Sequence, residues 1–225
     1  MRLTEVLPRE TGRDYALRTL KDNIIRLELV PGSMVSENEL AAALHLSRTP
    51  VREALIELSK SKIVEIYPQR GSKVSLVDYA LVEESQFIRK VLECAVVELC
   101  CQKATPGDLK SLEETIILQK LYTEHYDADA LLSLDNQFHR ILFEIVQKPQ
   151  AYALMSGVAI HFDRVRNMAL LTAQGESVIE DHREILSLIS KRDAAGARAR
   201  MEVHLSRYRV DEALIRKKYP AYFKP

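Results

Sequence analysis

The spacing of hydrophobic residues divides the chain into an amino-terminal third of short elements and a remainder of long ones. Leucines and isoleucines recur every three or four residues over 17–27, 36–44 and 47–58, which predicts three short helices. Two β-prone runs follow at 63–67 and 73–77, separated by turn-forming residues. The pattern predicts a small helical core with a β-hairpin beside it.

The remainder of the chain has helical spacing, beginning at Asp78, which is placed to cap a helix. The predicted helices cover 78–103, 128–147, 150–171, 176–191 and 193–218. One further helix is predicted to begin at Thr105-Pro106, between the first two of these. Long amphipathic segments joined by short breaks predict an antiparallel bundle of six or seven helices. We therefore predict a mainly α protein with two domains, residues 1–77 and 78–225.

The run SRTPVREAL at 47–55 combines a helix start with two arginines on one helix face. Ser47 is placed as the N-cap, and Pro50 fits the first turn, where backbone N–H groups have no partner one turn back. Arg48 and Arg52 lie together at the N-terminal end of this helix. Arginine suits contact with guanine or phosphate, so this helix is predicted to read DNA, with the hairpin as a wing. The alternative is that both arginines are ordinary solvated charges.

Composition and charge limit how such a surface can bind DNA. The chain has 225 residues, 47% of them hydrophobic, and no formal net charge. Residues 1–77 hold 12 Lys and Arg against 10 Asp and Glu, a net charge of +2, so phosphate binding must come from a local basic face. No stretch reaches the roughly 20 apolar residues of a membrane span, and no secretion signal is apparent, which predicts a cytoplasmic protein. Cys94, Cys100 and Cys101 lack paired metal-binding spacing and are expected to pack in a core.

Four residues in the predicted bundle have the chemistry of a metal site. Asp135 and His139 lie four residues apart among apolar positions of one helix, so both point to the same side. His182 and His204 each interrupt the inward stripe of a later helix. One carboxylate and three neutral imidazoles are a suitable ligand set for Zn²⁺, Ni²⁺ or Mn²⁺. The alternative is that each histidine is buried and hydrogen-bonded to a neighbour, which is commoner for single histidines.

The stretch from Pro31 to Ser75 resembles the winged helix of the GntR family of bacterial transcription regulators. The resemblance implies that Arg48, Thr49 and Arg52 touch DNA and that Gly71, at the tip of the wing, approaches the minor groove closely. Ser47 and Asn38 complete the predicted DNA-contacting set; Asn38 stands where several members carry an arginine. His45 and Lys62 also depart from the family pattern, since glycine is usual at both positions, and His45 is expected to adopt a left-handed turn.

The helical part resembles the FCD ligand-binding domain of the FadR subfamily. This resemblance rests on Asp and His in a D-x-x-x-H arrangement, the two later histidines and the run RDAAGARARMEVHL. It implies that Asp135, His139, His182 and His204 bind a divalent metal, zinc in the purified protein. It also implies that Arg89 grips the acid group of a small carboxylate effector. The alternative for Arg89 is an exposed helix charge paired with Glu93.

These features predict a sequence-specific transcription regulator rather than an enzyme. The regulator is expected to be a homodimer on a near-palindromic DNA operator, with half-sites about one helical turn apart. One rival is a metal-dependent enzyme acting on a small organic acid, because a metal with open positions can activate water. Another is a regulator whose metal is structural or is itself the signal. The effector, the operator sequence and the sign of regulation stay open.

Overall fold

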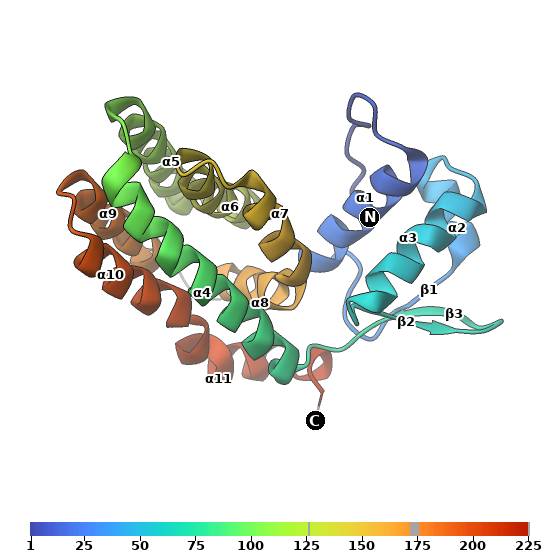
Figure 1. Ribbon diagram of the computed structural model, residues 1–225. Coiled ribbons are helices and arrows are strands. Elements are labelled where there is room, and N and C mark those ends of the chain that lie inside the picture. Colours follow the sequence, from blue (N-terminus) through green and yellow to red (C-terminus); the bar gives the residue numbers. More distant parts are fainter. Residues whose placement is uncertain (126, 172–175, 225) are drawn as a thin grey trace. The chain divides into compact units, whose positions relative to one another are not determined.

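The computed structural model describes residues 1–125, 127–171 and 176–224, and contacts within the chain divide it into two compact units. The first unit is Met1–Leu81 together with the segment from Tyr219 onward, and the second is Val82–Lys218. Figure 1 shows the elements of both, and each unit is described by itself.

The first unit contains the three predicted helices, α1 (Gly12–Ile25), α2 (Glu37–Leu44) and α3 (Arg48–Lys60). Their inward faces form one apolar core, because each helix places leucine, isoleucine or valine at three- and four-residue intervals. The buried side chains include Leu20, Ile24, Leu40, Leu44, Val51, Leu55 and Leu58. The packing of α1 against α3 leaves the opposite side of α3 in solvent.

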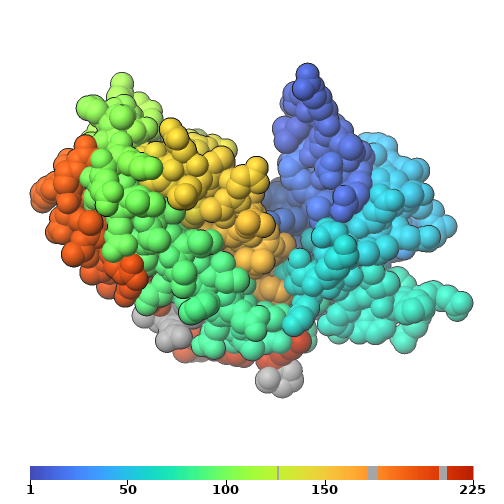
Figure 2. All heavy atoms as spheres, viewed as in Figure 1, coloured from blue at the N-terminus to red at the C-terminus, as the bar shows by residue number. Residues whose placement is uncertain are grey.

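A three-stranded antiparallel sheet completes this unit. The predicted hairpin is β2 (Val64–Tyr67) with β3 (Gly71–Val74), and β1 (Met34–Val35) pairs with the other edge of β3. A strand of two residues is too short to produce an alternating pattern, so the sequence did not predict β1. The hairpin projects from the body of its unit, as a wing does (Figures 1 and 2).

Two residues that stand in place of the family's usual glycines adopt left-handed backbone conformations. His45 ends α2 with φ 55° and ψ 39°, as expected, and Lys62 lies between α3 and β2 with φ 58°. The turns therefore form without glycine, at some cost in backbone strain.

Gly71 lies beside the wing turn, because the tip of the hairpin is formed by residues 68–70 and Gly71 opens β3 opposite Tyr67. This corrects the prediction that Gly71 is the tip residue. Its φ is +94°, and a Cβ there would lie 2.9 Å from the backbone oxygen of Val35 in β1. Glycine is required at this position by the sheet itself.

We expect Gly71→Ala to lower the free energy of unfolding by about 2 kcal/mol, because alanine meets both a left-handed φ and a backbone oxygen. Thermal or denaturant unfolding measures this. Gly107→Ala is the control, since the nearest atom to a Cβ there is 3.7 Å away, and it should be neutral or slightly stabilising. Equal stability of the two variants would contradict the explanation.

All regular secondary structure among the described residues of the second unit is helical. Its helices are α4 (Tyr79–Lys103), α5 (Pro106–Glu124), α6 (Ala128–Ile145), α7 (Pro149–Val158), α8 (Ile160–Leu170), α9 (Glu176–Ser190), α10 (Ala194–Ser206) and α11 (Tyr208–Lys218), with α4 starting in the first unit. Two segments predicted as single helices are each divided, at Ala159 and at Arg207. Asp78 does cap α4, since its side chain accepts from Ala80 N at 3.0 Å.

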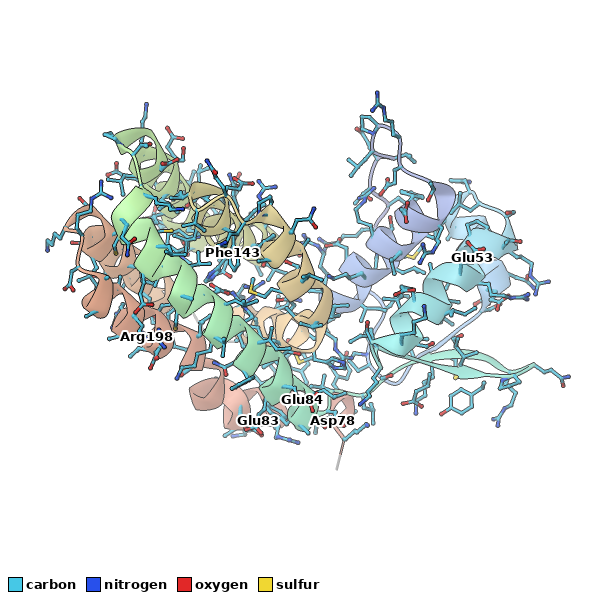
Figure 3. All side chains as sticks on the ribbon, in the orientation of Figure 1. Glu53, Asp78, Glu83, Glu84, Phe143 and Arg198 are labelled. Carbon is cyan, nitrogen blue, oxygen red and sulfur yellow. The ribbon has the colours of Figure 1, made fainter. Side chains whose placement is uncertain are left out.

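The core of this unit lies between α4, α5, α6, α9 and α10. It contains the three cysteines, which are buried and free, together with side chains such as Phe138, Leu142, Phe143, Ile185 and Met201. Burial raises the pKa of the Cys100 thiol to about 12. At the surface, an ion pair of 3.2 Å between Arg198 and Glu98 joins α10 to α4. Arg198 is labelled in Figure 3. Within the described residues, no helix is both long enough and apolar enough to cross a membrane.

The segment after α11 belongs to the first unit and pairs with Val77, just before α4. Val77 N donates to Tyr222 O at 2.8 Å, and Lys224 N donates to Val77 O at 2.9 Å. Phe223 is buried and stacks on Tyr79 with ring centroids 5.6 Å apart. The chain therefore passes between the two units twice.

Candidate metal centre and candidate nucleic-acid interface

The structure brings together the four residues predicted as metal ligands. Asp135 and His139 come from α6, His182 from α9 and His204 from α10, and all four are buried. One possible ligand atom from each lies within 4.8 Å of those of the others. Zinc–nitrogen bonds of about 2.0–2.1 Å in a tetrahedral shell place the donors roughly 3.4 Å apart, so the cluster is close to the size of a metal shell and needs only a small contraction to form one.

Each of the three imidazoles has its Nδ1 directed at an oxygen outside the cluster. His139 Nδ1 lies against Oε2 of Glu93, His182 Nδ1 lies 2.8 Å from Oε1 of Gln119, and His204 Nδ1 lies 3.4 Å from Oδ2 of Asp181. Carboxylate and amide oxygens accept hydrogen bonds, so the ring hydrogen of each histidine belongs on Nδ1. Each Nε2 then carries a lone pair.

The three Nε2 atoms point toward one another and toward Asp135. His182 Nε2 is 3.5 Å from Oδ1 of Asp135, and His139 Nε2 is 3.8 Å from Oδ2. The Nε2 atoms of His139 and His204 are only 3.2 Å apart, and two lone pairs at that distance repel each other unless a cation or an extra proton intervenes. His182 Nε2 is buried and has no hydrogen-bond partner among the described residues.

Electrostatics disfavour an extra proton on two of these rings. Burial lowers the pKa of His139 despite the neighbouring Glu93, and burial together with the other imidazoles lowers the pKa of His182 well below its ordinary value. Burial alone would raise the pKa of Asp135, but Arg166 and the three histidines outweigh it, and the carboxyl pKa falls. An ionised Asp135 facing neutral imidazoles fits a divalent metal.

Several residues that hold the cluster in place were not found from the sequence. Glu93 lies on α4 and Gln119 on α5, and neither has a motif that would reveal its role. Arg166 lies on α8, and its Nη1 donates to Oδ2 of Asp135 at 2.5 Å. Asp181, beside His182 on α9, contacts His204 on α10. These partners leave Oδ1 of Asp135 directed at the cluster.

Arg89 forms the ion pair with Glu93 that was considered for it, and its contact with an effector stays a prediction. Its guanidinium pairs with Glu93 at 2.7 Å, as the pairing alternative predicted, but the side chain is buried at 3% exposure rather than solvated. It also stands over the ring of Phe162 and lines a small cavity next to His139. That cavity, of about 20 Å³, is also lined by Asn136, Tyr152, Ser156 and Asp163. In this state it has room for about one water molecule.

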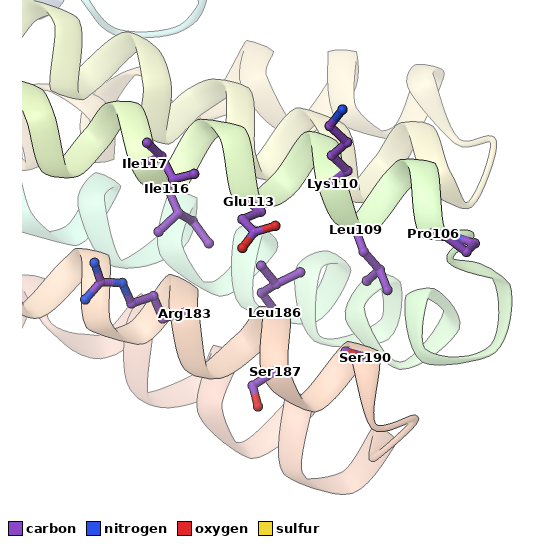
Figure 4. A pocket seen from close by; sticks show the side chains of 10 residues that line it. All are labelled: Pro106, Leu109, Lys110, Glu113, Ile116, Ile117, Arg183, Leu186, Ser187 and Ser190. Carbon is purple, nitrogen blue, oxygen red and sulfur yellow. The ribbon is translucent and has the colours of Figure 1, made fainter.

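A larger hollow lies elsewhere on the second unit, between α5 and α9 (Figure 4). Its volume is about 640 Å³, and charged side chains of Lys110, Glu113 and Arg183 surround apolar ones such as Ile116. None of the four clustered residues lines it. The hollow is therefore separate from the candidate metal centre.

On the first unit, the predicted DNA-contacting side chains at the starts of α2 and α3 are exposed. The side chains of Arg48 and Arg52 are 60% and 57% exposed, and Thr49 beside them is exposed. Ser47 occupies the N-cap position, but its side chain makes no capping hydrogen bond, so its hydroxyl is not committed to the helix. Asn38 is exposed at the start of α2.

A residue missed in the sequence joins this surface. Glu37, the first residue of α2, accepts hydrogen bonds from Arg52 Nε at 3.1 Å and from Arg48 Nη2 at 3.5 Å. The Arg52 hydrogen bond is the first cause, and the charge of both arginines a further one, that lowers the pKa of Glu37. The carboxylate is thus ionised at neutral pH.

Two families match the chain in succession. Residues 14–74 match the gntR family of bacterial regulatory proteins, and residues 84–207 match the FCD domain. The first covers the helical core and wing, and the second covers all four clustered residues.

Whole-chain relatives and solved structures agree with these matches. The chain is 31% identical over 203 residues to the HTH-type transcriptional repressor RspR of Escherichia coli K12, covering 90% of this chain and 89% of the relative. It is 33% identical over 216 residues to an HTH-type transcriptional regulator of Streptomyces ambofaciens, covering 96% and 90%. The structure of E. coli McbR/YncC matches with a TM-score of 0.79 at 22% identity, covering 93% of this chain and 99% of that one, and so supports the fold.

Proposed function

The chain belongs to the GntR family of bacterial regulatory proteins and carries an FCD domain, and on this premise we propose that a metal and a small carboxylate control its DNA binding. It is a DNA-binding transcription regulator, and its relatives are regulators rather than enzymes. The alternative of a metal-dependent enzyme acting on a small organic acid therefore has no support.

We propose that Asp135, His139, His182 and His204 bind one divalent metal ion. The observation that carries this proposal is the orientation of the imidazoles, since all three present Nε2 to one point while their Nδ1 atoms face fixed oxygens. Zn²⁺, Ni²⁺ and Mn²⁺ accept such donors, with zinc expected in the purified protein. When bound, the metal would supply a Lewis-acidic centre for an acid oxygen.

The effector we propose is a small carboxylate held at Arg89. The Arg89 guanidinium lines a polar cavity that also touches His139, so an acid group there would lie beside the metal ligands. The cavity must enlarge to admit more than about one water molecule. An effector that binds the enlarged state better shifts the packing of the helices, and through it the winged unit.

For DNA we propose contact through Arg48, Thr49 and Arg52, with Ser47 and Asn38 at the margin and the backbone of Gly71 in the wing. The exposed arginines at the N-terminal end of α3 support the choice of this helix. The regulator is proposed to bind as a homodimer to a near-palindromic operator with half-sites about one helical turn apart.

A regulator with a purely structural metal is the second candidate, and the small size of the cavity favours it. One experiment separates the two. Operator affinity is measured for metal-free protein, for zinc-loaded protein, and for zinc-loaded protein with a panel of small carboxylic acids. We expect at least one acid to change the affinity about fivefold or more, the usual lower range for coupled sites. A response to zinc but to no acid would support the structural or metal-signalling alternative.

A further inference from the structure

The carboxylate of Glu37 lies between the two arginines that are proposed to touch DNA. Arg52 contacts it in a fork, with Nε 3.1 Å from both carboxylate oxygens and Nη2 3.0 Å from Oε2. Arg48 reaches the same Oε2 through Nη2 at 3.5 Å. Glu37 opens α2 and Arg48 opens α3, so this contact joins the start of one helix to the start of the next.

Stability does not account for this arrangement. Both arginine side chains are more than half exposed, and ion pairs between exposed side chains contribute little to folding because water screens them. The same unit has another glutamate shared by two cations, Glu57, which contacts Arg13 at 3.3 Å and Lys60 at 2.9 Å. Glu57 lies near the opposite end of α3 and offers a matched comparison.

The position of Glu37 has two opposing consequences for DNA binding. Its negative charge repels phosphates and offsets one of the two positive charges of Arg48 and Arg52, leaving a net charge of +1 for the three side chains, which weakens binding to DNA of any sequence. Its hydrogen bonds also fix the guanidinium of Arg52, and an arginine held in one orientation loses less freedom when it pairs with a guanine. The Nη1 group of Arg52 has no acceptor among the described residues and can extend toward a base.

We propose that Glu37 is a positioning residue that raises sequence discrimination by holding Arg48 and Arg52 for base contact while weakening attachment to unrelated DNA. The inference rests on the proposed contact of these arginines with DNA. A base that fits the held guanidinium gains a preorganised partner, whereas phosphate contacts, which need no fixed orientation, gain nothing.

The test compares Glu37→Gln with Glu57→Gln, since both variants remove one negative charge from a glutamate shared by two cations. The specific DNA is a duplex that the wild-type protein selects from a random library, and the unrelated DNA is a scrambled duplex of equal length. Dissociation constants are measured for both duplexes over a salt series. For Glu37→Gln we expect binding to unrelated DNA to tighten about threefold, and the ratio of specific to unrelated affinity to fall about tenfold.

Glu57→Gln is expected to leave that ratio within about twofold of wild type. If Glu37→Gln behaves like Glu57→Gln, the inference is wrong, and likewise if it weakens binding to both duplexes equally. Arg52→Ala is measured in parallel: a loss of specific binding in that variant, with no change of ratio in Glu37→Gln, would overturn this inference and leave the proposed DNA surface intact. Wild-type affinity in Arg52→Ala would overturn both.

Discussion

Replacing Arg48 and Arg52 together by alanine should weaken operator binding about a hundredfold or more. Each arginine that contacts a base or phosphate contributes roughly 1–3 kcal/mol, and two such losses add to a factor of this size. Both side chains extend from the N-terminal end of α3 and are more than half exposed, so we expect the variant to fold. The measurement is the dissociation constant for the operator, taken at several salt concentrations.

The salt series shows which kind of contact was removed. Loss of a phosphate contact reduces the slope of log affinity against log salt by about 0.9 for each arginine, whereas loss of a base contact leaves the slope nearly unchanged. The control is Arg13→Ala with Lys60→Ala, which also removes two exposed cations that share one glutamate in the same unit. If the Arg48 and Arg52 double variant binds the operator as tightly as this control does, the N-terminal end of α3 is excluded as the DNA-reading surface.

His182→Ala should abolish the stabilisation that a divalent metal gives to the protein. A ligand present at a thousand times its dissociation constant stabilises the folded state by about 4 kcal/mol. For a protein of this size that corresponds to a rise in Tm of about 10 °C. The variant creates a cavity and lowers Tm by itself, so the quantity to compare is the difference between metal-loaded and chelator-treated samples of each protein. An undiminished difference in His182→Ala would rule out the proposed site.

A second variant tests whether the orientation of the His182 imidazole matters for metal binding. Gln119→Leu removes the oxygen that faces His182 Nδ1 at 2.8 Å but keeps all four ligands. Loss of such a partner weakens metal binding about 10- to 100-fold. Thr115→Val is the control, because Thr115 lies one turn earlier on α5 and its hydroxyl donates to Leu112 O within the same helix. Metal affinity should be normal in that variant.

Features encoded locally were predicted well from the sequence. Helical spacing placed α2, α3, α4 and α9 within a few residues of their observed bounds, because each has an apolar face repeating every three or four residues. The break at Arg207 was missed because no glycine or proline marks it, and the break at Ala159 was missed because Gly157, two residues before it, stands alone inside an otherwise helical pattern. The strand β1 is defined by its pairing with β3, which no local pattern records.

In the candidate metal centre too, the local features were predicted from the sequence and the long-range contacts were not. Asp135 and His139 share a helix face, so their spacing alone indicates that they lie together. The partners of the ligands come from other helices, and only the packing of α4, α5 and α6 brings Glu93 and Gln119 to the imidazoles. Glu37 was missed for the same reason, because eleven residues separate it from Arg48 and the turn between α2 and α3 closes that gap. Residue type indicated the ligands, whereas their orientation depended on tertiary structure.

The strand-like pairing of the carboxyl-terminal residues with Val77 affects how the winged unit can be studied in isolation. A fragment cut after Leu81 would lack Phe223 and so uncover Val77 and Tyr79, and it would leave the Val77 backbone groups without their partners at Tyr222 and Lys224. Such a fragment presents an apolar patch to water and invites self-association. A fragment that reproduces the native winged unit would need the segment from Tyr219 onward joined to it, for example by circular permutation.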